Sequence, residues 1–240
     1  MQFSDLKPKV VLGIAAHPDD LDFSSSGTMA KFAQNGAEIY YLILTDGSQG
    51  SADYDASPLE LAKIREAEQR SALKVIGSEP ENVTFLGYPD GALQITMEVK
   101  KDVVKVIRTV KPDVVVTMDP SVLYSSLRGF INHPDHRAAG QIALDAVFPL
   151  ARDHMAFPQL FSEGFLPHKV KTVLLTNFEK HNYFVDISST IDIKVAALKE
   201  HASQVPDIEK AEAMIKQWSS TMGKEAGYQY AEAFMRIDVN

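Results

Sequence analysis

Apolar residues along this chain follow two alternating patterns. Near-continuous apolar runs, typical of strands buried on both faces of a parallel sheet, cover 9–16, 37–45, 82–87 and 112–118. Stretches with apolar residues three and four positions apart, which predict helices, cover 26–36, 58–77, 96–111 and 134–150. Strands that alternate with helices pair in parallel through right-handed crossovers, so these patterns predict a doubly wound sheet.

The last part of the chain is less regular but continues the same theme. The predicted strands there are 169–177, 183–187 and 231–238, and the predicted helices are 189–204 and 207–222. No linker is visible, so we expect 1–240 to form a single domain, with 1–150 as its core and 151–240 completing it. The predicted fold class is α/β, a three-layer, doubly wound, mostly parallel sheet related to the Rossmann architecture.

Composition narrows the classes of protein. The chain has 240 residues, of which 45% are hydrophobic and 23% charged, as in ordinary soluble globular proteins. It has no cysteine, which excludes disulfides, thiolate nucleophiles and cysteine-ligated zinc, so any metal ion must be held by His, Asp or Glu. The net charge of −8 argues against a protein that binds the phosphate backbone of nucleic acid.

The sequence shows no segment suited to a membrane. No apolar run approaches the ~20 residues needed to cross a bilayer. The first apolar run is interrupted at His17, so no leader segment is expected either. These observations predict a cytoplasmic protein without a membrane span.

The tripeptide His-Pro-Asp occurs twice, at 17–19 and at 133–135, in a chain with 7 His and 12 Pro. A single copy is most often a helix start, with its aspartate near the positive end of the helix dipole. Both copies follow predicted buried strands, and this shared position favours a functional role. The first turn lacks G-x-G-x-x-G, so it does not bind a dinucleotide in the usual way.

Strand order predicts that the two copies meet. In open α/β sheets, ligands bind beyond the carboxyl ends of the strands, where the strand order reverses. In the order 3-2-1-4-5, the first and fourth strands flank that point. We therefore expect two groups of ionisable side chains to face each other: His17, Asp19 and Asp20, and His133 and His136.

Imidazole and carboxylate groups at such a place suit a metal ion. Catalytic zinc uses three protein ligands and keeps a fourth position for water. Two histidines and one carboxylate also form the site of non-haem iron enzymes. A closed site with four protein ligands would instead indicate a non-enzymatic metal-binding or sugar-binding protein. The residues alone therefore leave three functions open.

Several motifs resemble one known family. They are "AAHPDD" with "GT" at 15–28, "LTDGSQGS" at 44–51, "REAEQRSALKVIG" at 65–77, "LGYPDG" at 86–91 and "NHPDHRAAG" at 132–140. Together they resemble the PIG-L/LmbE-like family of zinc-dependent N-deacetylases, with a weaker likeness through 194–204. The resemblance implies a Rossmann-like fold and hydrolysis of an N-acetyl group from an N-acetylglucosamine-type substrate, releasing acetate and a free amine. It leaves the sugar or glycoside that carries the amine open, and a homo-oligomer is compatible with it.

The resemblance also implies a role for each motif residue. His17, Asp20 and His136 match the metal ligands, for one Zn²⁺ per chain, with other divalent ions left open. Asp19 matches the general base. His133 matches the residue that stabilises the oxyanion or acts as an acid.

Four further residues are expected to contact the substrate. Arg65 matches an arginine that commonly binds substrate in the family, and Asp90 suits a sugar hydroxyl. Tyr124 and Arg128 lie in the polar loop predicted at 119–132, where loops over a pocket usually supply recognition.

Overall fold

A seven-stranded sheet forms the centre of the molecule, in the order β3-β2-β1-β4-β7-β9-β8. The structure, a computed structural model, describes residues 6–126, 129–177 and 179–239. The strands of this sheet are β1 (Val10–Ala15), β2 (Glu38–Thr45), β3 (Val83–Tyr88), β4 (Val114–Met118), β7 (Thr172–Thr176), β8 (Tyr183–Asp186) and β9 (Ala231–Asp238). The predicted order of the first five strands is therefore confirmed.

Parallel pairing dominates the sheet, as the buried apolar runs predict. β1 pairs in parallel with β2 and β4, β2 with β3, and β4 with β7. β9 pairs antiparallel with both β7 and β8, which closes the far side of the sheet. β1 and β4 lie at the centre, and the side chains of Val11, Leu12, Val115 and Val116 are fully buried there.

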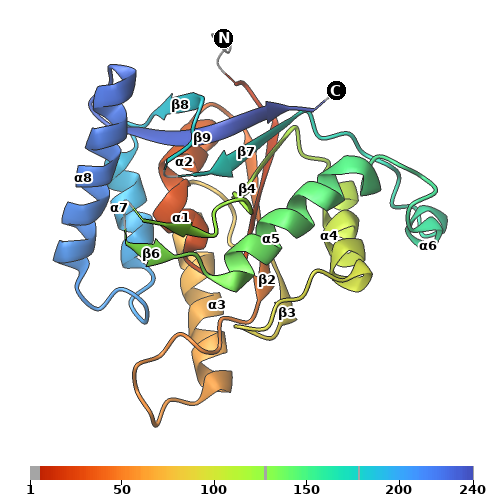
Figure 1. Ribbon diagram of the computed structural model, residues 1–240, viewed down its shortest axis with the longest axis horizontal. Helices are drawn as coiled ribbons and strands as arrows, with labels where there is room; N and C mark the ends of the chain where they lie inside the picture. The colour runs from red at the N-terminus through yellow and green to blue at the C-terminus, as the bar shows by residue number, and fades with distance from the viewer. Residues whose placement is uncertain (1–5, 127–128, 178, 240) are drawn as a thin grey trace.

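Helices cover both faces of the sheet (Figure 1). One face carries α1 (Asp20–Ser24), α2 (Ser26–Gln34), α3 (Pro58–Val75), α7 (Ile191–Lys199) and α8 (Ile208–Ala226). The other face carries α4 (Met97–Val110), α5 (Pro134–Asp145) and the π-helical turn η1 (Ala146–Leu150). A short helix, α6 (Pro158–Ser162), lies beyond them. The arrangement confirms the predicted three-layer α/β fold.

Close packing holds α5 against the carboxyl end of β4. Gly140 lies where a Cβ atom would stand 2.2 Å from the carbonyl oxygen of Met118. Only a glycine permits this approach of helix to strand. The contact matters for the site because α5 begins at the second His-Pro-Asp.

Three predicted segments differ in detail from the structure. The helix predicted over 189–204 ends at Lys199, so the residues that follow it form a turn. The helix predicted over 134–150 ends at Asp145 and continues as a π-helical turn, in which Phe148 has non-helical backbone angles and Pro149 lacks the N–H that a helix needs. The loop predicted at 119–132 contains a small antiparallel hairpin, β5 (Tyr124–Ser125) and β6 (Phe130–Ile131). Within the described part of the chain, no helix is long and apolar enough to cross a membrane.

Candidate active site

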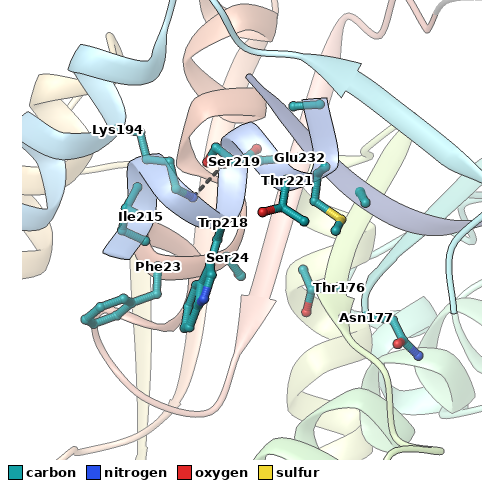
Figure 2. A pocket seen from close by; sticks show the side chains of 13 residues that line it. Phe23, Ser24, Thr176, Asn177, Lys194, Ile215, Trp218, Ser219, Thr221 and Glu232 are labelled. Carbon is teal, nitrogen blue, oxygen red and sulfur yellow. Dashed lines mark hydrogen bonds and ion pairs between the residues drawn. The ribbon is translucent and has the colours of Figure 1, made fainter. Parts of the chain in front are cut away.

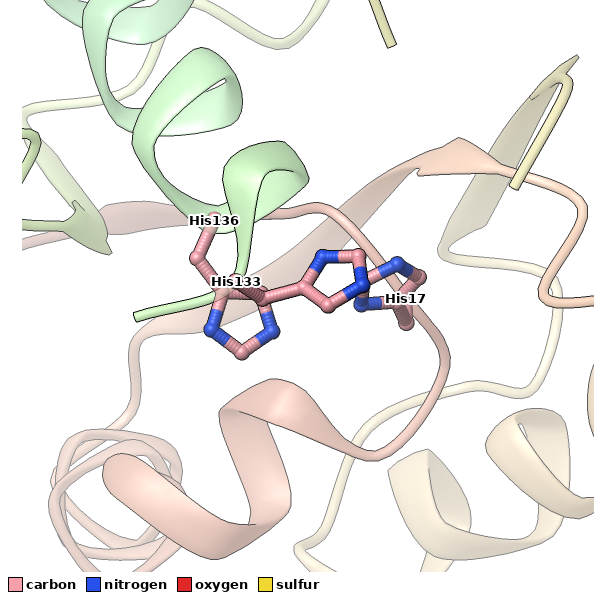
Figure 3. Close-up of side chains that lie close together, drawn as sticks. All are labelled: His17, His133 and His136. Carbon is pink, nitrogen blue, oxygen red and sulfur yellow. The ribbon is translucent and has the colours of Figure 1, made fainter. Parts of the chain in front are cut away.

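The two His-Pro-Asp copies converge at the carboxyl edge of the sheet. After β1 the chain crosses to β2 on one side, and after β4 it crosses to β7 on the other, so the strand order reverses between β1 and β4. His17 lies in the turn between β1 and α1, and His133 and His136 lie at the start of α5. Figure 3 shows the three imidazoles facing one another across this point.

The three histidines form a compact cluster. Their ring centroids lie 4.9 Å apart for His17 and His133, 5.3 Å for His17 and His136, and 5.4 Å for His133 and His136. One nitrogen from each ring lies within 4.8 Å of the others, close enough for the rings to share a metal ion. Imidazole nitrogens are preferred ligands of Zn²⁺ and related divalent ions, so this donor set fits a metal centre.

Asp20 joins the two halves of the cluster. Its Oδ1 lies 3.0 Å from His136 Nε2, and its Oδ2 lies 3.5 Å from His17 Nδ1 and accepts the His17 backbone N–H at 2.8 Å. Burial alone would raise the pKa of Asp20, but His136 and His17 outweigh it and hold that pKa well below its usual range. Asp20 is therefore a carboxylate under all ordinary conditions, as a metal ligand must be.

Two further carboxylates lie on the other side of His17. Its Nε2 is buried and lies 3.0 Å from Asp90 Oδ1 and 3.4 Å from Asp135 Oδ2, without the alignment of a good hydrogen bond. Burial by itself would lower the pKa of His17, but Asp20 and Asp90 raise it to about 10. A metal ion that binds His17 must displace this proton. Carboxylates behind a metal-binding histidine commonly orient its ring.

Asp19 differs from its neighbour Asp20 in both geometry and charge. Its backbone adopts the left-handed conformation, with φ 91° and ψ −28°, and its N–H donates to Gln69 Oε1 at 2.9 Å. Burial, helped by the negative charge of Asp20, raises the pKa of Asp19 to about 7, against the opposing charge of Arg65. A carboxyl group with a pKa near neutrality can both accept and return a proton.

His133 presents one free ring nitrogen. Its Nδ1 accepts the backbone N–H of Asp135 at 3.2 Å, at the start of α5. Burial, together with the charges of His17 and His136, lowers the pKa of His133. The neutral ring therefore carries its proton on Nε2, where it can donate a hydrogen bond.

The four residues expected to contact substrate lie in different surroundings. Arg65 is buried, and its guanidinium donates to the carbonyl oxygens of Gly47 and Pro18, each at 2.8 Å. Asp90 is buried too, and its Oδ2 accepts the backbone N–H of Gln49 at 2.9 Å. These contacts make both side chains part of the walls that shape the site.

The other two candidates belong to the β5–β6 region. Tyr124 is exposed and lies on the hairpin, away from the cavity lining described next. Arg128 lies outside the described residues.

A cavity of about 310 Å³ opens beside Asp20 and His136. Most of its other lining is apolar and comes from α1, from β4 and the segment after it, and from α8: Phe23, Met118, Val122, Phe130, Met214 and Trp218. Asp119, Asn132 and Asn177 add polar groups at its edge. Ligand pockets usually combine an apolar lining with a few placed polar groups. The sequence pattern did not predict the part played by α8, because nothing in its local spacing relates it to the motifs.

A second cavity, of about 270 Å³, continues from the first (Figure 2). The two share Phe23, Ser24, Thr176, Asn177 and Trp218. The far end of the second cavity is lined by Lys194 and Glu232, which form a buried ion pair at 2.6 Å. The two cavities are therefore adjacent, with Trp218 of α8 lining both, and we refer to them together as the groove.

A doubly wound sheet with a His/Asp cluster and a cavity at its switch point defines an α/β protein with a candidate metal centre at the carboxyl edge. Residues 12–147 match the family model of PIG-L, described as GlcNAc-PI de-N-acetylase. The chain belongs to the PIG-L family. This match confirms the resemblance drawn from the motifs and the predicted class of enzyme, an N-deacetylase.

Relatives cover nearly the whole chain. It is 35% identical to the diacetylchitobiose deacetylase of Thermococcus kodakarensis over 232 residues, which cover 96% of this chain and 83% of the relative. It is 25% identical to the probable N-acetyl-alpha-D-glucosaminyl L-malate deacetylase 2 of Bacillus anthracis over 199 residues, 81% of this chain and 80% of the relative. The solved N,N'-diacetylchitobiose deacetylase of Pyrococcus horikoshii, complexed with its inhibitor MPG, superposes with a TM-score of 0.88 at 32% identity, over 96% of this chain and 84% of that one.

Proposed function

We propose that this chain hydrolyses the acetamido group of a small N-acetylglucosamine-containing sugar or glycoside, releasing acetate and a free amine, with one zinc ion per chain. The names of the two relatives support the substrate class, because diacetylchitobiose and N-acetylglucosaminyl malate both contain an N-acetylated glucosamine joined to a second group. The groove supports it too, since it offers room beyond the His/Asp cluster for that second group.

One observation carries the proposal: neighbouring carboxyl groups contact different partners beside the histidine cluster. Asp20 lies against His136 and His17, as a metal ligand would, whereas Asp19 Oδ2 lies 3.4 Å from Arg65 Nη2. Acids in different surroundings are characteristic of acid–base catalysis, and burial, which raises the pKa of Asp19 to about 7, agrees with the role of a base. A purely structural metal site has no need of the second carboxyl group.

His17, Asp20 and His136 are the residues that would hold the zinc ion, with His17 oriented by Asp90 and Asp135. Zinc, when bound, acidifies water and polarises a carbonyl oxygen, the two changes that amide hydrolysis requires. Other divalent ions fit the same donors.

Asp19 would then transfer the proton of the attacking water, and His133 would stabilise the negative charge that develops on the carbonyl oxygen. Asp19 accepts a proton from the attacking water and returns it to the departing amine, which its pKa near neutrality allows. His133 donates from Nε2 to the oxygen of the former carbonyl as negative charge develops there. Such a donor contributes ~3 kcal/mol to stabilising the transition state in comparable enzymes.

The remaining parts of the chain would complete the binding site. We infer that 1–240 acts as one domain, because 151–240 supplies β7, β9 and the α8 wall of the groove. Trp218 lines both cavities and offers a flat face on which a sugar ring can stack. Tyr124 stays a predicted substrate contact on the β5–β6 hairpin.

The test is acetate release by zinc-loaded protein. N-acetylglucosamine, N,N'-diacetylchitobiose and an aryl N-acetylglucosaminide are incubated with the protein, and free acetate and primary amine are measured in parallel. We expect equal amounts of acetate and amine from at least one of the two extended substrates, loss of turnover with a chelator, and recovery with zinc. Absence of acetate from all three with one zinc bound per chain contradicts the proposal. Oxygen consumption with Fe²⁺ and none with Zn²⁺ would identify a non-haem iron enzyme instead.

A further inference from the structure

A chain of buried polar side chains leads from Asp19 into the interior, and no step of the reaction above uses it. Its members are Gln69, Asp22 and His201, and we name them the support chain. We propose, building on the deacetylase function above, that the support chain positions Asp19 as the base. These three are positioning residues, because they act through Asp19 and not on the substrate.

The support chain is continuous. The Asp19 N–H donates to Gln69 Oε1 at 2.9 Å, and Gln69 Nε2 donates to Asp22 Oδ2 at 2.7 Å. His201 Nε2 lies 2.9 Å from the same Asp22 oxygen. Gln69, Asp22 and His201 are each fully buried. The members come from α3, from α1 and from the turn that follows α7, so three separate elements meet here.

Hydrogen bonds at both ends fix the orientation of the Gln69 amide. Asp22 Oδ2 accepts a hydrogen bond from the amide nitrogen of Gln69 and lies within hydrogen-bond distance of His201 Nε2. The Gln69 carbonyl oxygen is then turned toward Asp19, where it meets the backbone N–H. A reversed amide would place an acceptor against an acceptor at Asp22. Buried polar groups left in that state cost about 1–3 kcal/mol each.

Two side chains of α3 form hydrogen bonds with both polar groups of one peptide bond. Arg65 Nη2 donates to the carbonyl oxygen of Pro18 at 2.8 Å, and Gln69 accepts the N–H of Asp19. This carbonyl and this N–H belong to the single peptide bond between Pro18 and Asp19. Arg65 and Gln69 are four residues apart on α3 and therefore lie on one face, one turn from each other. Both polar groups of this peptide bond are therefore held by side chains of α3.

Asp19 needs such a clamp because of its backbone. Its φ of 91° lies in the left-handed region, which costs a residue other than glycine about 1–3 kcal/mol. In that conformation Asp19 Oδ2 lies 3.4 Å from Arg65 Nη2, whereas Asp20 contacts His136 and His17, so the two acids face different partners. Without the support chain, the peptide group can rotate back toward an ordinary conformation. The carboxyl group would swing with it, out of reach of the water it must deprotonate.

The support chain also links the base to the C-terminal part of the molecule. His201 follows α7, far along the chain from the first His-Pro-Asp, and yet it ends the network that holds Asp19. Asp22 receives both Gln69 and His201 on one oxygen, so the position of His201 is transmitted to Gln69.

Three variants test the support chain. Gln69→Met keeps the length of the side chain and removes both hydrogen bonds. His201→Leu removes the final donor, whereas His201→Gln restores an N–H that can reach Asp22. The control is Thr172→Val, which removes a partly buried hydrogen bond of 2.9 Å to Asp238 at the amino end of β7, the opposite edge of the sheet.

The expected result separates positioning from stability. In Gln69→Met, kcat falls by about 10–100-fold, the scale of a displacement near 1 Å, while KM and bound zinc change little. His201→Leu shows a smaller loss in kcat, and His201→Gln recovers most of it. Thr172→Val lowers the melting temperature without lowering kcat.

Amide hydrogen exchange supplies a readout that needs no substrate. The Asp19 N–H should exchange about 10-fold faster or more in Gln69→Met and faster in His201→Leu, and it should stay protected in His201→Gln and Thr172→Val. If the wild type releases no acetate, the proposed function fails, and exchange at Asp19 alone decides the support chain. If the wild type is active but a folded, zinc-loaded Gln69→Met keeps its kcat, or if Asp19 stays protected in that variant, the support chain is overturned.

Discussion

Replacing Gly140 with alanine tests whether close packing of α5 on β4 delivers His136 to the site. The added Cβ would stand 2.2 Å from the carbonyl oxygen of Met118 and 3.0 Å from Pro120 Cδ, whereas real Cβ atoms essentially never come within 3.0 Å of another heavy atom. The obstacle at Met118 is backbone, so it cannot rotate away as a side chain would. α5 must move outward, and His133 and His136 move with it.

The sign of the stability change makes this test decisive. In an unhindered helix, Gly→Ala stabilises by about 1 kcal/mol. Forcing an atom into a closely packed contact costs about 1–3 kcal/mol or more, so we expect Gly140→Ala to lose free energy of unfolding instead of gaining it. A displacement approaching 1 Å at His136 should weaken zinc binding and lower kcat by up to about 100-fold.

The assay is denaturant unfolding together with zinc content after dialysis. Gly223→Ala is the matched control, because its Cβ would stand 2.7 Å from the backbone oxygen of Tyr228, near the end of α8 and away from the His/Asp cluster. We expect both variants to be destabilised and only Gly140→Ala to lose zinc. A Gly140→Ala protein as stable as the wild type, with a full complement of zinc, would refute the reasoning.

Two other predictions concern charged side chains, one buried at Arg65 and one partly exposed at Asp113. Arg65→Lys keeps the charge but loses the fixed pair of guanidinium donors that bind Pro18 and Gly47 together. The variant should lose about 1–3 kcal/mol of stability, and its kcat should fall more than its KM rises. A rise in KM alone would indicate that Arg65 binds substrate directly. Burial would raise the pKa of Asp113, but Lys171 and backbone N–H groups outweigh it and lower that pKa. The ionised carboxylate therefore stabilises the folded protein fully above the unfolded pKa of about 3.9, and this stabilisation is lost as pH falls through the lowered folded-state value. Asp113→Asn should therefore cost about 1 kcal/mol at pH 7 and progressively less as pH falls through the lowered pKa, and equal unfolding curves at pH 7 would contradict this assignment.

The fold was predictable because its signals are local. Apolar runs such as 112–118 and the helical spacing over 58–77 each identify their element without reference to the rest of the chain. Alternation then determines parallel pairing, and parallel pairing brings the two His-Pro-Asp copies to one edge. The meeting of His17 with His136 followed from that logic alone.

The side chains around the His/Asp cluster were not predictable, because they depend on which face each helix presents to the site. Arg65 stays a predicted substrate contact, but its burial against the turn after β1 follows from the packing of α3 and could not be predicted. Gln69 lies on the same face of α3 as Arg65. In the sequence, only its position four residues after Arg65 indicates this. His201 meets Asp22 through long-range packing of α7. The weaker likeness through 194–204 includes His201, but it indicates neither a role nor a partner for that residue.

The separate roles of Asp19 and Asp20 are the central claim. Asp20 contacts two imidazoles and stays ionised, whereas Asp19 faces Arg65 with a pKa of about 7. The two residues are adjacent, and only their surroundings distinguish them.

The most direct test measures bound zinc and kcat together in Asp19→Asn and Asp20→Asn. Asp19→Asn keeps the shape but removes the base, so zinc should stay at the wild-type level while kcat falls ~10²–10⁴-fold. Asp20→Asn should bind zinc weakly, and excess Zn²⁺ should restore part of its activity. If Asp19→Asn is instead the variant that loses zinc and recovers when zinc is added, the roles of the two carboxylates are reversed and the account is wrong.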